Sequence, residues 1–429
     1  MRILDVCFIE YMTMDNLYDS NLRYSGLSAK GRALFWWMLY VFGYFNNTLT
    51  NIILPNKDVS LVLNFVIGFY IYNKYKYLGE DTLLIKKNTI GIWLLMLLMF
   101  ISPIVPMLDY GQPYLNTIIS QRFNYAILFA LVLLSVKPQQ EELLYIMKIG
   151  ARISVVLFVI GLFFPGFLMD SETISETELS RYEHDSTDVG AGCPGFGLMV
   201  MYFYFCCGKL TQNPRRSDII EMMVILAVII AIQNRSTLIG VLPAFCWCIL
   251  RIRSNNRMFI YGFIGIMILV AIPFISIIYN SLMEETQIQL DDENYNRWQA
   301  LSFYLVEMKT NMWHYLIGNG VWTSFGEYKK IMVSAQDFRG CYISDIGILG
   351  TYFYYGIIPL YIIYKYCFTA FRSSGVPLAL KLYALWVVIV PTIQPYLMLT
   401  IGGNALIALF FYLVTYYSQM NDGYISYNS

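Results

Sequence analysis

Long apolar runs separated by short polar stretches recur from residue 33 to residue 417. A helix needs about 20 mainly apolar residues to cross the hydrocarbon core of a bilayer. Twelve runs reach or approach that length, which predicts an all-α polytopic membrane protein with residues 1–429 in one membrane domain. The runs are 33–54, 58–74, 89–108, 123–136, 147–168, 191–209, 218–232, 236–250, 258–279, 342–364, 377–395 and 398–417.

The stretch 218–250 could form one helix or two, because only the triplet 233–235 interrupts it. One helix of about 32 residues would be roughly 48 Å long, which exceeds a hydrocarbon core of about 30 Å. It would also place the arginine cluster at 251–257 outside the cell. Basic clusters mark cytoplasmic loops, so we expect a tight hairpin of two spans.

Basic residues are distributed unevenly between the two sides of this predicted topology. With a cytoplasmic N-terminus, the cytoplasmic segments carry 20 of the 29 lysine and arginine residues, and the outer segments carry 9. Cytoplasmic loops of membrane proteins are enriched in these residues. We therefore expect both termini in the cytoplasm.

Two predicted outer loops are longer than a connection needs to be. Residues 169–190 form an acidic loop, and residues 280–341 form a large loop whose apolar residues recur at three- and four-residue steps. That spacing, behind the acidic start 291–293, predicts an amphipathic helix suited to lying on the membrane or over the bundle. Its apolar positions are Trp298, Leu301, Leu305, Met308, Met312 and Leu316.

Composition and charge support the membrane class and narrow the function. The chain is 57% hydrophobic and 14% charged, with a mean hydropathy of +0.53, whereas soluble domains carry about 25% charged residues. Because 29 basic residues balance 29 acidic ones, no overall field would attract nucleic acid. The eight cysteines show no metal-binding spacing, so we expect no metal site.

Arginine residues on the predicted outer side are candidate anion ligands. Arg235 lies in the turn between two apolar runs, where an ionised side chain costs free energy unless lipid phosphate or a functional anion partners it. A guanidinium group binds phosphate oxygens bidentately. Each arginine alone could instead be an interfacial or solvated charge. The candidates for a pyrophosphate clamp are Arg235, Arg122, Arg297 and Arg339.

Few residues could act as a catalytic base. Asp345 lies at the outer end of the run 342–364, where a carboxylate either starts a helix or accepts a proton. The only two histidines, His184 and His314, fall in the outer loops and could serve as a base or a phosphate partner. We take Asp345 as the first candidate base and His314 as the second.

Three motifs occur in a fixed order across the second half of the chain. Residues 234–240 (Asn-Arg-Ser-Thr-Leu-Ile-Gly) open a predicted span, and residues 314–320 (His-Tyr-Leu-Ile-Gly-Asn-Gly) lie in the large loop. Residues 344–350 (Ser-Asp-Ile-Gly-Ile-Leu-Gly) open the next span. This order resembles the bacterial O-antigen polymerases of the Wzy type, within the O-antigen ligase and polymerase superfamily. The resemblance covers roughly residues 215–365.

The resemblance implies an inner-membrane glycosyltransferase that works at the periplasmic face without a metal or cofactor. Its substrates would be oligosaccharide repeat units carried on undecaprenyl pyrophosphate, in contact with membrane lipids, and a chain-length regulator and a flippase would be partners. In this superfamily outer-face arginines engage the pyrophosphate, a role that falls best on Arg235 and more loosely on Arg122, Arg297 and Arg339. Many relatives carry a histidine where this chain has Ser344 and Asp345, so the base stays open.

Two other functions remain open from the sequence. An O-antigen ligase has the same general architecture and differs in its acceptor. A lipid-linked oligosaccharide flippase or another transporter would also have many spans, but transporters usually show repeated halves and charged sites near the membrane midplane. This chain shows no internal repeat and carries its candidate arginines and longest loop on one predicted side. We therefore favour the polymerase over the transporter and over a structural scaffold.

Overall fold

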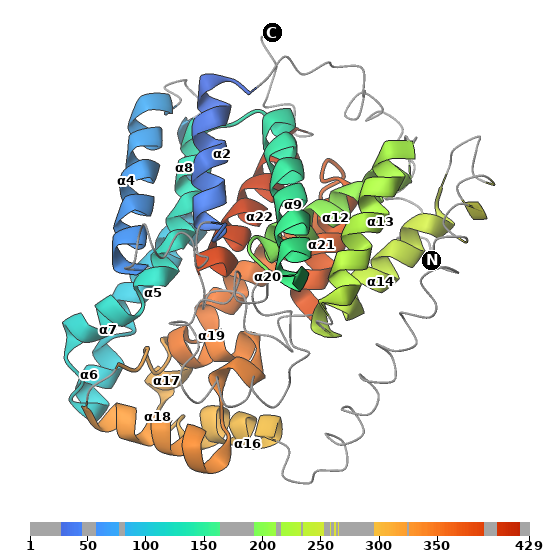
Figure 1. The fold of residues 1–429 in the computed structure, drawn as a ribbon. Helices are drawn as coiled ribbons and strands as arrows, with labels where there is room; N and C mark the ends of the chain where they lie inside the picture. The colour runs from blue at the N-terminus through green and yellow to red at the C-terminus, as the bar shows by residue number, and fades with distance from the viewer. Residues whose placement is uncertain are drawn as a thin grey trace.

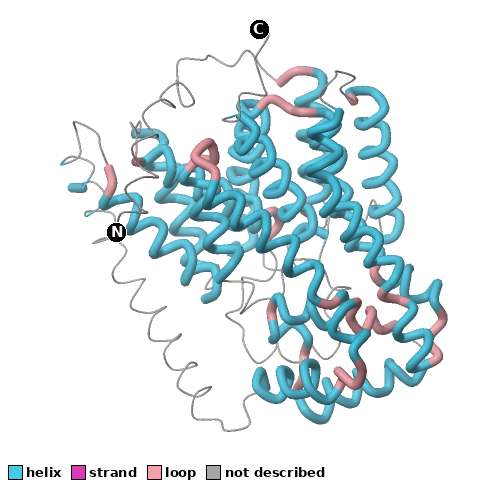
Figure 2. Tube along the Cα trace, turned by 180° about the vertical axis from the view of Figure 1, so that it is seen from behind, coloured by secondary structure: helices cyan, strands magenta, loops and turns pink. Residues whose placement is uncertain are grey.

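A computed structural model describes residues 27–44, 57–76, 82–163, 193–211, 216–232, 235–252, 296–323, 326–389 and 401–420, together with a few single residues between 258 and 265. Every regular element in these ranges is helical (Figure 2), which confirms the predicted all-α class for this part of the chain. The acidic loop 169–190 and the predicted span 258–279 lie outside these ranges, apart from those single residues.

The longer helices pack together as one group, which we call the bundle (Figure 1). Helix α12 packs against α9, α13, α14 and α21, and α22 packs against η3 and α8. The bundle consists of α2 (Ala29–Val41), α4 (Lys57–Tyr75), α5 (Thr82–Ile101), the 3-10 helix η3 (Arg122–Leu128), α8 (Phe129–Val136), α9 (Gln140–Phe163), α12 (Phe196–Leu210), α13 (Arg216–Ala231), α14 (Arg235–Leu250), α20 (Ile357–Arg372), α21 (Leu378–Ile389) and α22 (Ile401–Met420).

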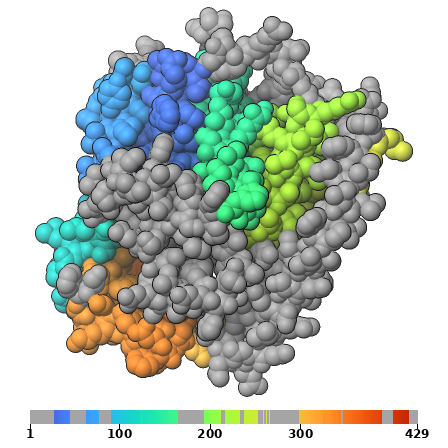
Figure 3. Space-filling model, viewed as in Figure 1, coloured from blue at the N-terminus to red at the C-terminus, as the bar shows by residue number. Residues whose placement is uncertain are grey.

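Shorter helices form a second group at the bottom of Figure 1, which we call the short-helix lobe. Helix α18 packs against α6, and α17 packs against α19 and α20. Figure 3 shows the α6–α7 surface and the residue-300s surface side by side at this end. The lobe consists of α6 (Ile104–Tyr110), α7 (Tyr114–Ser120), α16 (Asn296–Ser302), the π-helix η5 (Phe303–Glu307), α17 (Met312–Leu316), α18 (Gly326–Arg339), the 3-10 helix η6 (Ile343–Ile346) and α19 (Ile348–Tyr355).

Helix α5 carries a stripe of exposed apolar residues along one face. Ile90, Trp93, Leu97 and Phe100 are all exposed, and they follow one another at three- and four-residue steps. The stripe continues along α6 to Leu108, which is 73% exposed. Because the opposite face of α5 is buried in the bundle and also apolar, the helix is apolar on both sides. A helix of this kind suits a lipid environment.

Two described stretches, Ile90–Tyr110 and Gln140–Phe163, are long and apolar enough to cross a membrane. The stretch 114–120 and the stretch 124–136 would make a third span if they count as one helix bent by 63°. Helices α12, α14 and α21 are apolar but shorter. These stretches give the chain the character of a membrane protein, and the number of spans stays a prediction.

The run 218–250 forms two helices, α13 and α14, as the hairpin interpretation requires. The run 342–364 does not form one continuous helix, which corrects the expectation of a single uninterrupted span helix. It is divided into η6, α19 and α20 by Gly347 and Gly356, whose φ angles are 60° and 76°. A residue with positive φ cannot continue a right-handed helix, so the chain turns at both glycines although its hydropathy stays high.

The predicted amphipathic helix over 298–316 is also interrupted, into α16, η5 and α17. The π-helical turn holds an extra residue and rotates the side chains that follow it. Phe303, Tyr304 and Met308 are buried, whereas Trp298 and Met312 are exposed. The side chain of Asn311 accepts hydrogen bonds from the backbone N–H groups that start α17, so a new helix begins there.

Candidate functional site

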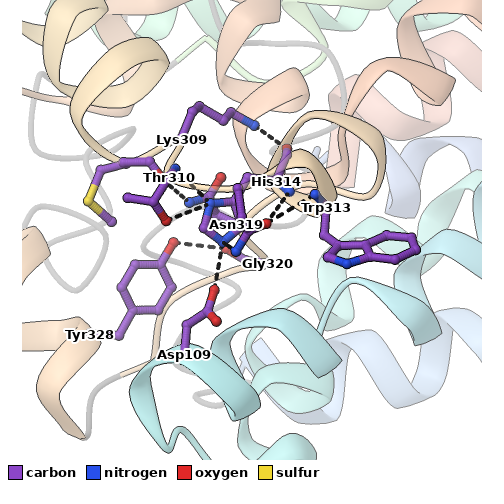
Figure 4. A network of polar contacts seen from close by, with 10 residues as sticks. Asp109, Lys309, Thr310, Trp313, His314, Asn319, Gly320 and Tyr328 are labelled. Carbon is purple, nitrogen blue, oxygen red and sulfur yellow. Dashed lines mark hydrogen bonds and ion pairs between the residues drawn. The ribbon is translucent and has the colours of Figure 1, made fainter.

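A buried histidine and a carboxylate meet where α17 packs beside α6 (Figure 4). His314 Nε2 lies 2.6 Å from Asp109 Oδ2. The His314 side chain is 1% exposed, whereas the Asp109 side chain is 33% exposed. The pair therefore joins a group inside the protein to a carboxylate that solvent or a substrate can reach.

The backbone around His314 decides which ring nitrogen carries the proton. The N–H of Thr310 lies 3.1 Å from His314 Nδ1 and donates to it, so Nδ1 is the accepting nitrogen. The remaining nitrogen, Nε2, then carries the proton and donates to Asp109. With both nitrogens engaged, His314 orients the carboxylate, and Asp109 is the better placed group to accept a proton from a substrate.

Lys309 lies next to this pair and is buried. Its Nζ donates to the carbonyl of His314 at 2.5 Å and lies 4.4 Å from the centre of the Tyr352 ring. It thereby ties the segment before α17 to the middle of α17 and to α19. Burial lowers the pKa of the Lys309 ammonium group to about 7, because removal from water disfavours the charged form.

We expect the thermal stability of the protein to rise between pH 7 and about pH 10 through Lys309. The pKa of this lysine falls from its ordinary value of 10.5 to about 7 in the folded protein. Between these values the unfolded chain binds more protons than the folded one, so raising the pH favours folding, and below pH 7 the slope vanishes. The melting temperature of the purified protein, followed across this range, measures the effect.

A Lys309→Met variant should lose that pH dependence. The melting temperature of wild type should therefore rise relative to that of the variant as the pH increases from 7 to about 10. Lys330, whose side chain is 76% exposed, provides the control. The melting temperature of a Lys330→Met variant should change with pH as that of wild type does. If the melting temperatures of wild type and Lys309→Met differ by the same amount from pH 7 to 10, the predicted effect of Lys309 burial is contradicted.

Glycines bring the loop segment that follows His314 against the end of α19. The N–H of Asn319 donates to the carbonyl of Phe353 at 2.7 Å, and the N–H of Gly320 donates to that of Tyr354 at 3.0 Å. A Cβ atom at Gly318 would overlap the peptide between Tyr354 and Tyr355. The contact between these two backbones therefore depends on glycine.

Gln112 holds the other side of the site in place. Its Nε2 donates to the carbonyl of Val321 at 2.9 Å, and its Oε1 accepts from the N–H of Thr323 at 3.1 Å. Tyr110 stacks on Tyr328 with ring centres 4.4 Å apart. These contacts fix α6 to the segment that begins at His314, so the Asp109–His314 pair lies on a supported frame.

The remaining sequence-predicted residues have different positions. Arg339 forms an exposed ion pair with Glu307 at 2.7 Å, and Arg122 donates to the carbonyl of Ile119 at 3.0 Å. The side chains of Arg235, Arg297 and Asp345 lie outside the described part of the chain, as does His184. Their parts in a site stay predictions, and of the two candidate bases His314 is the one whose surroundings are defined.

Sequence reasoning missed Asp109 and Lys309. Asp109 follows the apolar run 89–108 directly, and a carboxylate at the outer end of a span is a signal of the kind used for Asp345. The only signal for Lys309 was its position in the sequence, between Met308 and Met312 of the predicted amphipathic helix. Neither signal indicates the partner, because Asp109 and His314 are 205 positions apart.

Within the described ranges, no group of three or more histidine, cysteine, aspartate or glutamate side chains could hold a metal ion. Comparisons of the chain with protein-family models and with curated proteins find no match. The functional assignment therefore rests on the residues of the chain and on the geometry around Asp109 and His314.

Proposed function

We propose that the chain is an O-antigen or surface polysaccharide polymerase, a metal-independent glycosyltransferase of the bacterial inner membrane. It would join oligosaccharide repeat units carried on undecaprenyl pyrophosphate at the periplasmic face. One observation carries the proposal. The motif segment 314–320 bonds through its backbone to the end of α19, just after the motif 344–350, beside the Asp109–His314 pair.

The proposal includes about twelve spans with both termini in the cytoplasm. Contacts between distant segments support this sidedness. The residues after the run 89–108 and the loop 280–341 are both predicted outside, and they meet through Asp109 and His314. Residues before the first run and residues after the run 123–136 are both predicted inside, and Lys30 Nζ donates to the carbonyl of Lys137 at 3.2 Å.

The proposed reaction is a displacement at the anomeric carbon of the lipid-linked glycan. The Asp109 carboxylate accepts the proton of the attacking sugar hydroxyl while His314 holds the carboxylate in place. The new bond joins that hydroxyl oxygen to the anomeric carbon, and the bond from this carbon to the pyrophosphate oxygen breaks. The leaving undecaprenyl pyrophosphate takes the electron pair, and its growing charge calls for cations. Arg235, with Arg122 and Arg297, is proposed for that role.

Analysis of glycan ladders tests the proposal. The gene is deleted in its native bacterium and restored as wild type or as Arg235→Ala at matched protein level. We expect single-repeat glycan after deletion and a full ladder with wild type. Loss of one charge-assisted contact of about 1.5–3 kcal/mol should reduce the ladder of Arg235→Ala about 10- to 100-fold.

Other outcomes of the same experiment favour the alternatives. Polymer that forms but stays on its carrier lipid after deletion would indicate an O-antigen ligase. Repeat units that accumulate on the cytoplasmic side would indicate a flippase. A ladder unchanged by deletion would contradict both enzyme functions.

A further inference from the structure

Helix α17 has one residue directed into the protein and an apolar surface directed outward. His314 is buried, whereas Met312 is 74% exposed and Trp313 is 64% exposed. Tyr315 and Leu316 are exposed as well. Figure 4 shows the Trp313 indole pointing away from the polar network around His314. We call Met312, Trp313, Tyr315 and Leu316 the α17 tip.

The contact between α17 and α6 places α17 relative to the candidate membrane span that ends in α6. Asp109 lies at the end of the stretch Ile90–Tyr110, which is long and apolar enough to cross a membrane. The exposed apolar stripe of α5 and α6 runs up to Leu108, one residue before Asp109. Because Asp109 contacts His314 at 2.6 Å, α17 lies at the depth where this stripe ends.

A second apolar stripe approaches α17 from the bundle. Helix α17 packs against α20, on which Ile357, Tyr361 and Phe368 are exposed. These three residues lie at helical spacing on one face. The α17 tip therefore belongs to a helix that packs against α20 with its apolar stripe and that bonds through His314 to the end of the α5–α6 stripe.

Tryptophan and tyrosine are enriched at the two boundaries between membrane and water, where their rings combine an apolar body with a polar group. The α17 tip has this composition and lies at the end of a candidate span. We propose that the α17 tip inserts into the interfacial layer of the phospholipid bilayer and holds Asp109 at the depth of the lipid headgroups. The inference does not depend on the proposed glycosyl transfer, because it uses only the apolar surface and the position of α17.

Photo-crosslinking of the full chain in bilayers tests this contact. Trp313 is replaced by the photoreactive residue benzoylphenylalanine, and the protein is purified into nanodiscs of phosphatidylethanolamine and phosphatidylglycerol. After irradiation, mass spectrometry of the intact chain should show the added mass of one phospholipid. The same label at Lys330, an exposed position on α18 that pairs with Glu327, should give several-fold less lipid adduct.

A second labelled position, Met312, makes the result independent of the replacement of Trp313. Met312 is more exposed than Trp313 and belongs to the same tip, so the label there should also capture phospholipid. Equal lipid capture at Trp313, Met312 and Lys330 would overturn the proposal. Capture of a second copy of the chain, or of no partner, at both tip positions would overturn it as well. Each labelled protein is first checked by size-exclusion chromatography, so that only folded chains are compared.

Discussion

An Asp109→Asn variant is expected to lower the yield of polymer by about 100-fold or more at matched protein level, because a positioned general base contributes 10²–10⁴-fold to rate. The asparagine side chain keeps an oxygen that can accept from His314 Nε2, so the contact between α6 and α17 should survive. The substitution removes the negative charge of the carboxylate and with it the ability to take up a proton. The yield is measured from glycan ladders of the deletion strain that expresses the variant.

Two companion variants separate catalysis from structure. Asp337 is an exposed carboxylate on α18 in the same lobe, so Asp337→Asn makes the same chemical change away from the pair and should leave the ladder unchanged. A His314→Ala variant keeps the carboxylate but removes its support, and we expect a smaller loss than for Asp109→Asn. If Asp109→Asn retains a full ladder, the pair is structural, and Asp345 becomes the candidate base to test next.

The bundle was largely predictable because its helices follow hydropathy. The runs 58–74 and 236–250 agree with α4 and α14 to within a few residues, since a long apolar run has few alternatives to a helix in a nonpolar environment. The division of the run 218–250 into α13 and α14 was also predictable, from its length and from the arginines after it. A hydropathy profile shows where apolar residues are concentrated along the chain, but it does not show where a helix breaks inside an apolar run.

The break at Gly356 illustrates this limit. The residues on both sides are apolar, so the run 342–364 looks continuous, but Gly356 lies so close to Leu316, forty positions away, that a Cβ atom would not fit there. The interruption of the helix over 298–316 has a local signal instead, because the side chain of Asn311 caps α17 and asparagine is a favoured N-cap residue. A tertiary contact overrides the local pattern at Gly356, whereas the local pattern itself ends the helix before α17.

The candidate site was less predictable than the bundle for the same reason. His314 could be selected because histidine is rare in this chain, but its engagement on both nitrogens depends on the backbone of Thr310 and on Asp109. A single sequence does not reveal pairs that are far apart. The backbone bonds from Asn319 and Gly320 join the motif 314–320 to the end of α19, a contact that the order of the motifs along the chain does not by itself predict.

Replacement of Gly356 by alanine is expected to destabilise the protein by about 4 kcal/mol, as the sum of two effects. The backbone of Gly356 has φ 76° and ψ −165°, a region that only glycine occupies readily. A Cβ atom there would also overlap the carbonyl oxygen of Leu316 at the end of α17. Such a loss should unfold a large fraction of the chain, which size-exclusion profiles and melting temperatures in detergent would measure.

Two other glycines separate the backbone effect from the steric one. Gly111 has φ 62°, but a Cβ atom added there would meet nothing within 4 Å, so Gly111→Ala should cost only the left-handed conformation, about 1–2 kcal/mol. Gly402 lies in α22 with open space around it, and Gly402→Ala should be neutral or stabilising by up to about 1 kcal/mol. If Gly356→Ala lowers the free energy of unfolding no more than Gly111→Ala does, the carbonyl of Leu316 can move aside for the added methyl group. The close approach of Gly356 to Leu316 would then contribute little to the stability of the junction between α17 and the helix pair α19 and α20.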